Sequence, residues 1–165
     1  MNKPLRAIDR AQLAELQERA RQAPRHRANL NLHEGDGALL HRILMGVCPQ
    51  SYVRPHRHNQ AHKMEMVIIL DGQMDWLFFD EAGHLTARVP LQPGGEIRTV
   101  EVPPGIFHAA VARAAANCFL EVKQGPYDAA TDKEWAPWSP AEGTPEGERY
   151  RDWMMNARIG EQYKG

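Results

Sequence analysis

The first periodic segment of the chain has the spacing of an amphipathic helix, in which apolar residues return every three or four positions. Asp9 stands three residues before Gln12, as the two partners of a helix-capping box do, and Pro24 is a strong stop signal. The apolar positions are Ile8, Leu13, Leu16 and Ala20. We therefore predict a helix that runs from Asp9 to about Ala23.

After Pro24 the period of the pattern changes to two, as in a strand with one polar face. In residues 25–33 the polar positions are Arg27, Asn29, Asn31 and His33, and the apolar ones are Ala28, Leu30 and Leu32. Short apolar or β-branched runs then follow at intervals of roughly 8–12 residues. They cover residues 38–47, 52–58, 65–70, 74–80, 85–91, 97–102, 108–112 and 118–123. Many short strands at this spacing predict a sandwich or a barrel.

The C-terminal part of the chain has a different pattern. Residues 125–145 are rich in Pro, Gly and Trp and show no period, so we expect them to wrap over the barrel. Residues 146–162 carry apolar side chains at helical spacing and predict a last helix. We expect a single domain made of a helical segment (1–24), a β-barrel (25–127) and a C-terminal wrap with a short helix (128–165).

Charge and composition restrict the class of protein. The 165 residues carry a net charge of −1 and contain no long basic run, which argues against nucleic-acid binding. The apolar runs are far shorter than the ~20 residues that span a bilayer, and the N-terminus lacks the apolar core of a signal peptide. We therefore expect a cytoplasmic protein without a membrane segment. In that compartment the two cysteines, Cys48 and Cys118, are expected to be buried thiols rather than a disulfide.

Candidate chemistry begins with two histidines separated by one residue. On a strand, His56 and His58 would lie on the same face, and two neutral imidazoles suit a first-row divalent metal. Glu65 opens an apolar run, where a carboxylate must either face solvent or be paired. His108 follows a Pro-x-Gly turn and opens the next strand. Taken singly, each feature has an ordinary explanation: a surface pair, an outward Glu, or a core or surface His.

In combination, these features resemble the two sequence motifs of the cupin superfamily in order and spacing. The resemblance implies an all-β cupin jelly-roll barrel in which His56, His58, Glu65 and His108 bind one metal. The gap between His58 and Glu65 holds six residues, where the motif usually has three or four. Because this longer loop contains His62, that residue is an alternative ligand. Ala112 stands where the second motif usually ends in Asn, which is not a ligand.

Four segments further resemble the WbuC family of cupin-fold metalloproteins and together cover roughly residues 24–142. Lys63 and Glu65 keep two of the three residues of a Lys-Asp-Glu sequence found in that family. Members are associated with surface-polysaccharide gene clusters, which implies a role in polysaccharide biosynthesis and a sugar or nucleotide-sugar ligand. The four segments are Arg25–His33, Tyr52–His58, Glu121–Tyr127 and Asp132–Trp138.

Three histidines and one glutamate leave coordination positions open on the metal, as catalysis requires. The set suits Fe, Mn, Ni, Co or Zn, and such a metal can polarise a carbonyl or hydroxyl, lower the pKa of bound water, or bind oxygen. We expect a metalloenzyme for a small carbohydrate-like molecule, either an isomerase or epimerase or a dioxygenase. The alternative is a non-catalytic module that binds metal and ligand or acts as a sensor.

Four further residues are candidates for the pocket. Glu121 and Lys123 lie on one face of a strand with Phe119, where they would support the metal ligands or grip a substrate, unless that face is solvated. By strand parity Tyr52 and Arg54 share the face of His56 and His58. We take Lys123, Glu121 and Tyr52 as catalytic candidates, and Arg54 and Lys123 as substrate-binding candidates. The polar edge of residues 27–33 is a candidate for an anion site or a homodimer contact.

Overall fold

The N-terminal helix is where the capping pattern places it. The computed structural model describes residues 5–165, and α1 spans Arg10–Gln22. The side chain of Asp9 accepts a hydrogen bond from the backbone N–H of Gln12, and the Gln12 side chain accepts one from the N–H of Asp9. These two bonds satisfy N–H groups that a helix start leaves free, and they confirm the prediction.

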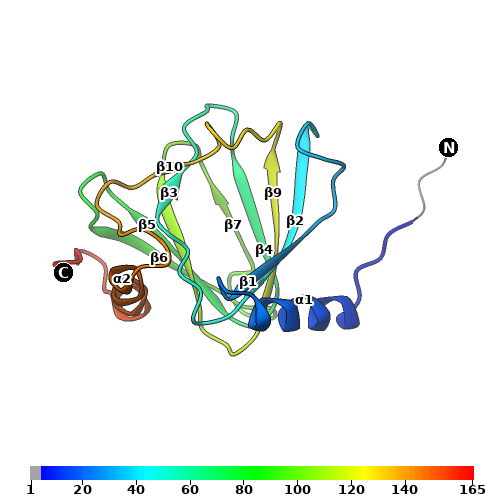
Figure 1. The fold of residues 1–165 in the computed structure, drawn as a ribbon, viewed down its shortest axis with the longest axis horizontal. Coiled ribbons are helices and arrows are strands. Elements are labelled where there is room, and N and C mark those ends of the chain that lie inside the picture. Colours follow the sequence, from blue (N-terminus) through cyan, green and yellow to red (C-terminus); the bar gives the residue numbers. More distant parts are fainter. Residues whose placement is uncertain (1–4) are drawn as a thin grey trace.

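Ten strands form two antiparallel five-stranded sheets within residues 5–165 (Figure 1). The first sheet has the order β1 (Arg27–Asn31), β2 (Leu40–Val47), β9 (Asn117–Gln124), β4 (Glu65–Asp71) and β7 (Thr99–Val102). The second has the order β10 (Glu134–Trp135), β3 (His56–Arg57), β8 (Phe107–Ala112), β5 (Met74–Phe79) and β6 (Leu85–Leu91). This arrangement is the expected jelly roll, in which neighbours in space are often distant in sequence.

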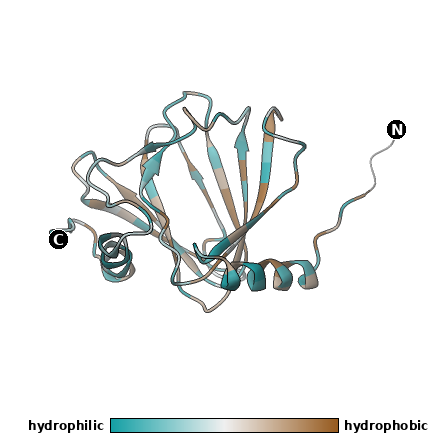
Figure 2. Cartoon of the chain, in the orientation of Figure 1, coloured by the Kyte–Doolittle hydropathy of each residue, from teal (hydrophilic) through white to brown (hydrophobic). Residues whose placement is uncertain are grey.

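The alternation of side chains along the first sheet explains how it packs on two sides. Met45 and Phe119 belong to the core between the sheets, whereas the adjacent Leu44 and Cys118 point to the other face and pack against Leu16 of α1. Figure 2 shows hydrophobic and hydrophilic residues alternating along the strands, and Figure 1 shows α1 beneath the first sheet. Cys48 and Cys118 are free, buried thiols.

The last helix, α2, is shorter than predicted. It spans Pro145–Asn156, with Thr144 as its N-cap, and not residues 146–162. The backbone of Ala157 is extended, and Gly160 adopts a φ of 92°, so the chain turns away from the helix axis. Gln162 then forms a β-bridge with His84. The buried side chains of α2, Tyr150 and Met154, lie in a core cluster beside the second sheet.

Two strands also differ from the predicted pattern. The run 52–58 is a strand only over His56–Arg57, because Tyr52 packs in the α2 core cluster rather than continuing the sheet. The C-terminal wrap contributes β10, which pairs with β3 and which no periodic pattern signalled. No helix within residues 5–165 is long and apolar enough to cross a bilayer.

Candidate metal centre

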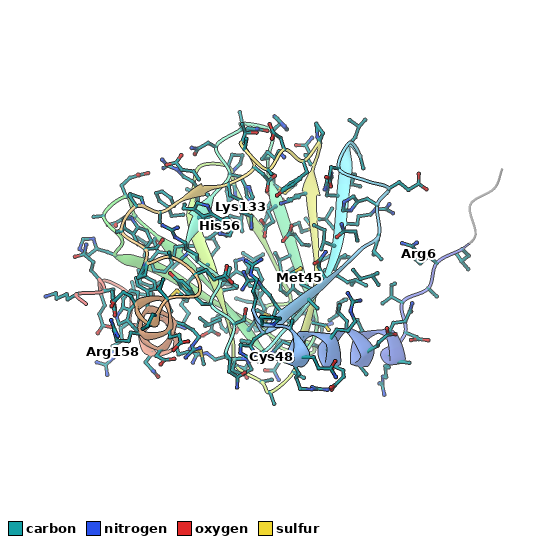
Figure 3. All side chains as sticks on the ribbon, viewed as in Figure 1. Arg6, Met45, Cys48, His56, Lys133 and Arg158 are labelled. Carbon is teal, nitrogen blue, oxygen red and sulfur yellow. The ribbon has the colours of Figure 1, made fainter. Side chains whose placement is uncertain are left out.

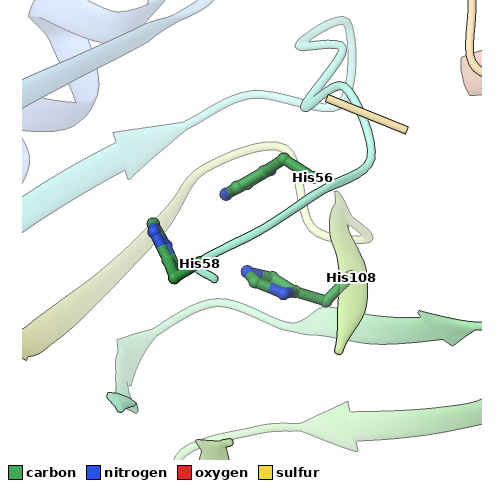
Figure 4. A group of neighbouring side chains, drawn as sticks. All are labelled: His56, His58 and His108. Atoms are coloured by element: carbon green, nitrogen blue, oxygen red, sulfur yellow. The ribbon is translucent and has the colours of Figure 1, made fainter. Parts of the chain in front are cut away.

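Three buried histidines meet at the boundary of β3 and β8. His56 in β3 pairs directly with His108 in β8, and His58 follows β3 by one residue. One ring nitrogen of each histidine lies within 4.8 Å of the others, and each residue is at most 5% exposed. Figure 4 shows the three rings pointing toward a common centre. The pairing of β3 with β8 therefore brings the histidines of two distant sequence motifs together in one cluster.

The hydrogen bonds of the rings determine which nitrogen is available. Nδ1 of His56 donates to the backbone carbonyl of Arg54 at 2.9 Å, and Nδ1 of His108 donates to that of Ile106 at 2.9 Å. Nδ1 of His58 donates to the carbonyl of Asp132. A carbonyl can only accept, so each Nδ1 carries hydrogen and each Nε2 keeps its lone pair in the neutral ring. This is how metal-binding histidines are commonly oriented.

Converging lone pairs need a hydrogen-bond donor or a cation between them, such as a water molecule, a protonated ring or a metal ion. Nε2 of His108 is buried and has no hydrogen-bond partner within residues 5–165. Burial, followed by the charge of Lys133, holds the pKa of His56 well below its usual value. Protons are therefore disfavoured at His56, whereas neutral imidazoles are the form that a metal binds. The three histidines fit a metal ion.

Glu65 supplies a carboxylate to the same centre from the start of β4. Its Oε2 lies 3.1 Å from Nε2 of His58 and 3.8 Å from Nε2 of His108, and the residue is 4% exposed. Burial alone would raise the pKa of Glu65, but hydrogen bonds and positive charge from His108 and His58 outweigh burial and hold its pKa well below the usual value. With the rings neutral, a metal ion between them would supply that positive charge. By contrast, the alternative ligand His62 is exposed on the loop and lies outside the cluster.

A cavity of about 250 Å³ adjoins the centre. His56, Glu65 and His108 reach it, and its remaining wall is divided into an apolar and a charged part. The apolar part includes Met45, Val47, Trp76, Ala110 and Phe119. The charged part consists of Arg25, Arg27, Arg54, Glu121 and Lys133. This division suits a small molecule that has both polar groups and an apolar surface.

The four other candidates occupy different positions. Glu121 lines the cavity, and burial, followed by the charge of Glu65, raises its pKa. Arg54 also lines the cavity, but it donates to the hydroxyl and carbonyl of Ser139. Lys123 lies behind the wall, 3.0 Å from Asp132 and 3.5 Å from Glu121. Tyr52 points into the α2 core cluster and donates to the carbonyl of Pro140.

Two important residues escaped the sequence analysis as candidates for the site. Asp132 is buried between Lys63 and Lys123 and presents its carbonyl to His58, and Lys133 lines the cavity. Both lie in the segment Asp132–Trp138 that the WbuC resemblance quoted, but no local pattern marked them. Asp132 is 69 positions from Lys63, so only the fold brings these charges together.

Residues 8–91 match the model of a family described as a domain of unknown function, DUF6016. The chain belongs to this family. No curated protein matches the DUF6016 chain with significance. The likeness to the WbuC family stays a prediction, because the matching family model is a different one.

Solved structures share the fold of the DUF6016 protein. An oxalate oxidase in complex with the substrate analogue glycolate is 14% identical, with a TM-score of 0.53, over 70% of this chain and 57% of that one. A structure from a study of DMSP lyases is 16% identical, with a TM-score of 0.50, over 67% and 52% of the two chains. A cupin 2 conserved barrel domain protein from Leptotrichia buccalis is 18% identical, with a TM-score of 0.46, over 60% and 41%.

These comparisons concern the fold alone, which is the cupin jelly roll. The chain spans little more than half the length of the first two structures, so their activities belong to larger chains. Within that fold, the DUF6016 protein carries a buried three-histidine cluster able to bind a metal.

Proposed function

We propose that this protein is a metalloenzyme that binds one divalent transition metal and acts on a small, carbohydrate-like molecule. The ligands are His56, His58, Glu65 and His108. The observation that carries the proposal is the set of Nε2 lone pairs that converge in a buried site, each fixed by an Nδ1 hydrogen bond to a backbone carbonyl.

The position of the cavity supports catalysis over simple metal storage. When bound, the metal supplies Lewis-acid or oxygen chemistry, and four protein ligands leave room for a substrate atom. His56, Glu65 and His108 border the cavity, so a molecule held there lies next to the metal. The apolar wall around Phe119 limits water, and Glu121 offers a carboxylate for proton transfer at the cavity surface.

The kind of substrate follows from the lining and from the resemblance to the WbuC family. A cavity of about 250 Å³ suits a small molecule better than a polymer. Its lining combines charged and apolar groups, which suits a molecule with hydroxyl groups on a carbon skeleton. Isomerisation or epimerisation would need only a Lewis acid, whereas a dioxygenase would need a redox-active metal such as iron.

The test of the metal site is elemental analysis of untagged protein, beside a His56→Ala/His108→Ala double variant. We expect nearly one metal per chain in the wild type and almost none in the double variant. His62→Ala is the matched control, because His62 is an exposed histidine outside the cluster. Wild-type protein that carries no metal and takes none up on reconstitution would refute the metal site.

The test of catalysis uses metal-loaded protein with a panel of small sugars, in air and under anaerobic conditions. Turnover that requires oxygen would identify a dioxygenase, and turnover with several divalent metals without oxygen would identify an isomerase or epimerase. Tight sugar binding without any turnover would contradict the enzyme and identify a non-catalytic module.

A further inference from the structure

Four cationic side chains line the cavity, and three of them are engaged by protein groups. Arg25 and Arg27 both pair with Glu142, at 2.6 and 2.7 Å. Arg54 donates to Ser139 and to the carbonyl of Ala136. These cations are therefore held by the protein and have limited freedom to bind a ligand.

Lys133 is the fourth cation, and it has no hydrogen bond or ion pair with any group in residues 5–165. Its ammonium lies 5.8 Å from the ring centroid of Trp135, which is a weak contact for a cation. An ammonium has three donors to satisfy. In the mouth of the cavity, those donors are available to water or to a bound molecule.

The fold holds Lys133 close to the candidate metal centre. The residue immediately precedes β10, whose Trp135 pairs with His56. Lys133 lines the same cavity as His56, Glu65 and His108, and Figure 3 labels Lys133 and His56 beside each other between the two sheets. The Lys133 side chain is exposed in this opening, and its charge helps to lower the pKa of His56.

The charges around the cavity do not balance once a metal is bound. Lys63 and Lys123, behind the wall, are offset by Asp132 and by Glu121, whose carboxylate also lines the cavity. That leaves the carboxylate of Glu65 facing the ammonium of Lys133 and a divalent metal. The site therefore has an excess of positive charge, which attracts an anion into this partly enclosed space.

We propose that Lys133 binds a carboxylate group of the substrate, so that the ligand is a small organic acid anion, such as a sugar acid, rather than a neutral sugar. This inference rests on the proposed function and names the chemical class of its substrate. A single ammonium matches one carboxylate as a charge-assisted donor. Phosphate groups are commonly held by several backbone N–H groups or by an arginine fork, and Lys133 offers neither.

The experiment is calorimetric titration of metal-loaded and metal-free protein with three probes: glucuronate, glucose and inorganic phosphate. Wild-type protein should bind glucuronate at least tenfold more tightly than glucose. Lys133→Met should weaken glucuronate binding about tenfold and leave glucose binding unchanged, while Lys133→Arg should retain most of the affinity. Lys164→Met is the matched control, because Lys164 is exposed near the C-terminus and does not line the cavity.

Elemental analysis of the same samples separates the two proposals. Metal in both the wild type and Lys133→Met, together with equal affinity for glucuronate and glucose, would overturn the role of Lys133 and leave the metal site standing. If Lys133→Met weakens phosphate binding but leaves glucuronate binding unchanged, the inference that Lys133 binds a carboxylate would be overturned. Absence of metal in the wild type would contradict the proposed function, and the metal-free titrations would still decide whether Lys133 selects a carboxylate.

Discussion

The ammonium of Lys63 donates a hydrogen bond of 2.9 Å to Oδ1 of Asp132, and both side chains are at most 2% exposed. Lys123 binds the other carboxylate oxygen at 3.0 Å. The backbone carbonyl of the same Asp132 accepts the Nδ1 hydrogen of His58. A buried ion network therefore fixes the loop that orients one candidate metal ligand.

Asp132→Asn should destabilise the protein and weaken metal binding. Within residues 5–165, the substitution removes the only full negative charge that both lysines contact, and breaking a buried pair costs about 3–5 kcal/mol. Urea unfolding should show a loss of that order. Loss of support behind a metal ligand commonly reduces metal affinity by about 10–100-fold. Asp152→Asn is the control, because Asp152 is 67% exposed, and its ion pair with Arg151 is worth about 1 kcal/mol or less.

The same carboxylate should make stability depend on pH in acid. Burial would raise the pKa of Asp132, but the charge of Lys123 and the hydrogen bonds from Lys63 and Lys123 outweigh it, so the pKa in the folded state lies below the usual value of an aspartate. A lowered folded pKa gives stability that is complete above the unfolded pKa of about 3.9 and is lost as the pH falls through the folded value. The difference in unfolding free energy between the wild type and Asp132→Asn should be constant above about pH 5 and shrink below pH 4. A difference that persists unchanged to pH 2 would contradict this account.

Local sequence patterns predicted the elements whose signals are themselves local. The capping box of Asp9 and Gln12 involves residues one turn apart, and the alternation over residues 25–33 reflects the pleat of a single strand, β1. The cupin motifs likewise identified His56, His58, Glu65 and His108, which the fold brings together.

What the sequence left out depends on contacts between distant segments. Strand β10 has two residues and exists because it pairs with β3, and Lys133 reaches the cavity only through that pairing. The helix α2 stops at Asn156, although apolar spacing continues to Ala157, because the following turn leads Gln162 to His84. Neither outcome has a periodic signature.

Gly46→Ala should loosen the contact between α1 and the first sheet. A Cβ at Gly46 would lie 2.7 Å from the backbone carbonyl oxygen of Leu16. This oxygen belongs to the backbone of α1, so it can move away only if the whole helix shifts. Overpacking of this kind costs about 1–3 kcal/mol. Gly37→Ala is the matched control, since a Cβ there meets nothing within 4 Å and the backbone is not left-handed. Equal unfolding free energies for the two variants would show that the helix adjusts freely.

Metal loading should stabilise the folded chain, because the ligands converge only in the folded state. At a free metal concentration 100 times the Kd, binding contributes about 2.7 kcal/mol, which for a chain of this size raises the unfolding temperature by roughly 5–10 °C. A chelator should reverse the shift. His108→Ala removes the buried Nε2 that has no hydrogen-bond partner among residues 5–165, and should abolish most of the shift, whereas His62→Ala should keep it. Melting of each variant, with and without metal, is measured by calorimetry or fluorescence. A metal-induced shift in His108→Ala as large as in the wild type would mean that the metal stabilises the protein at some other place.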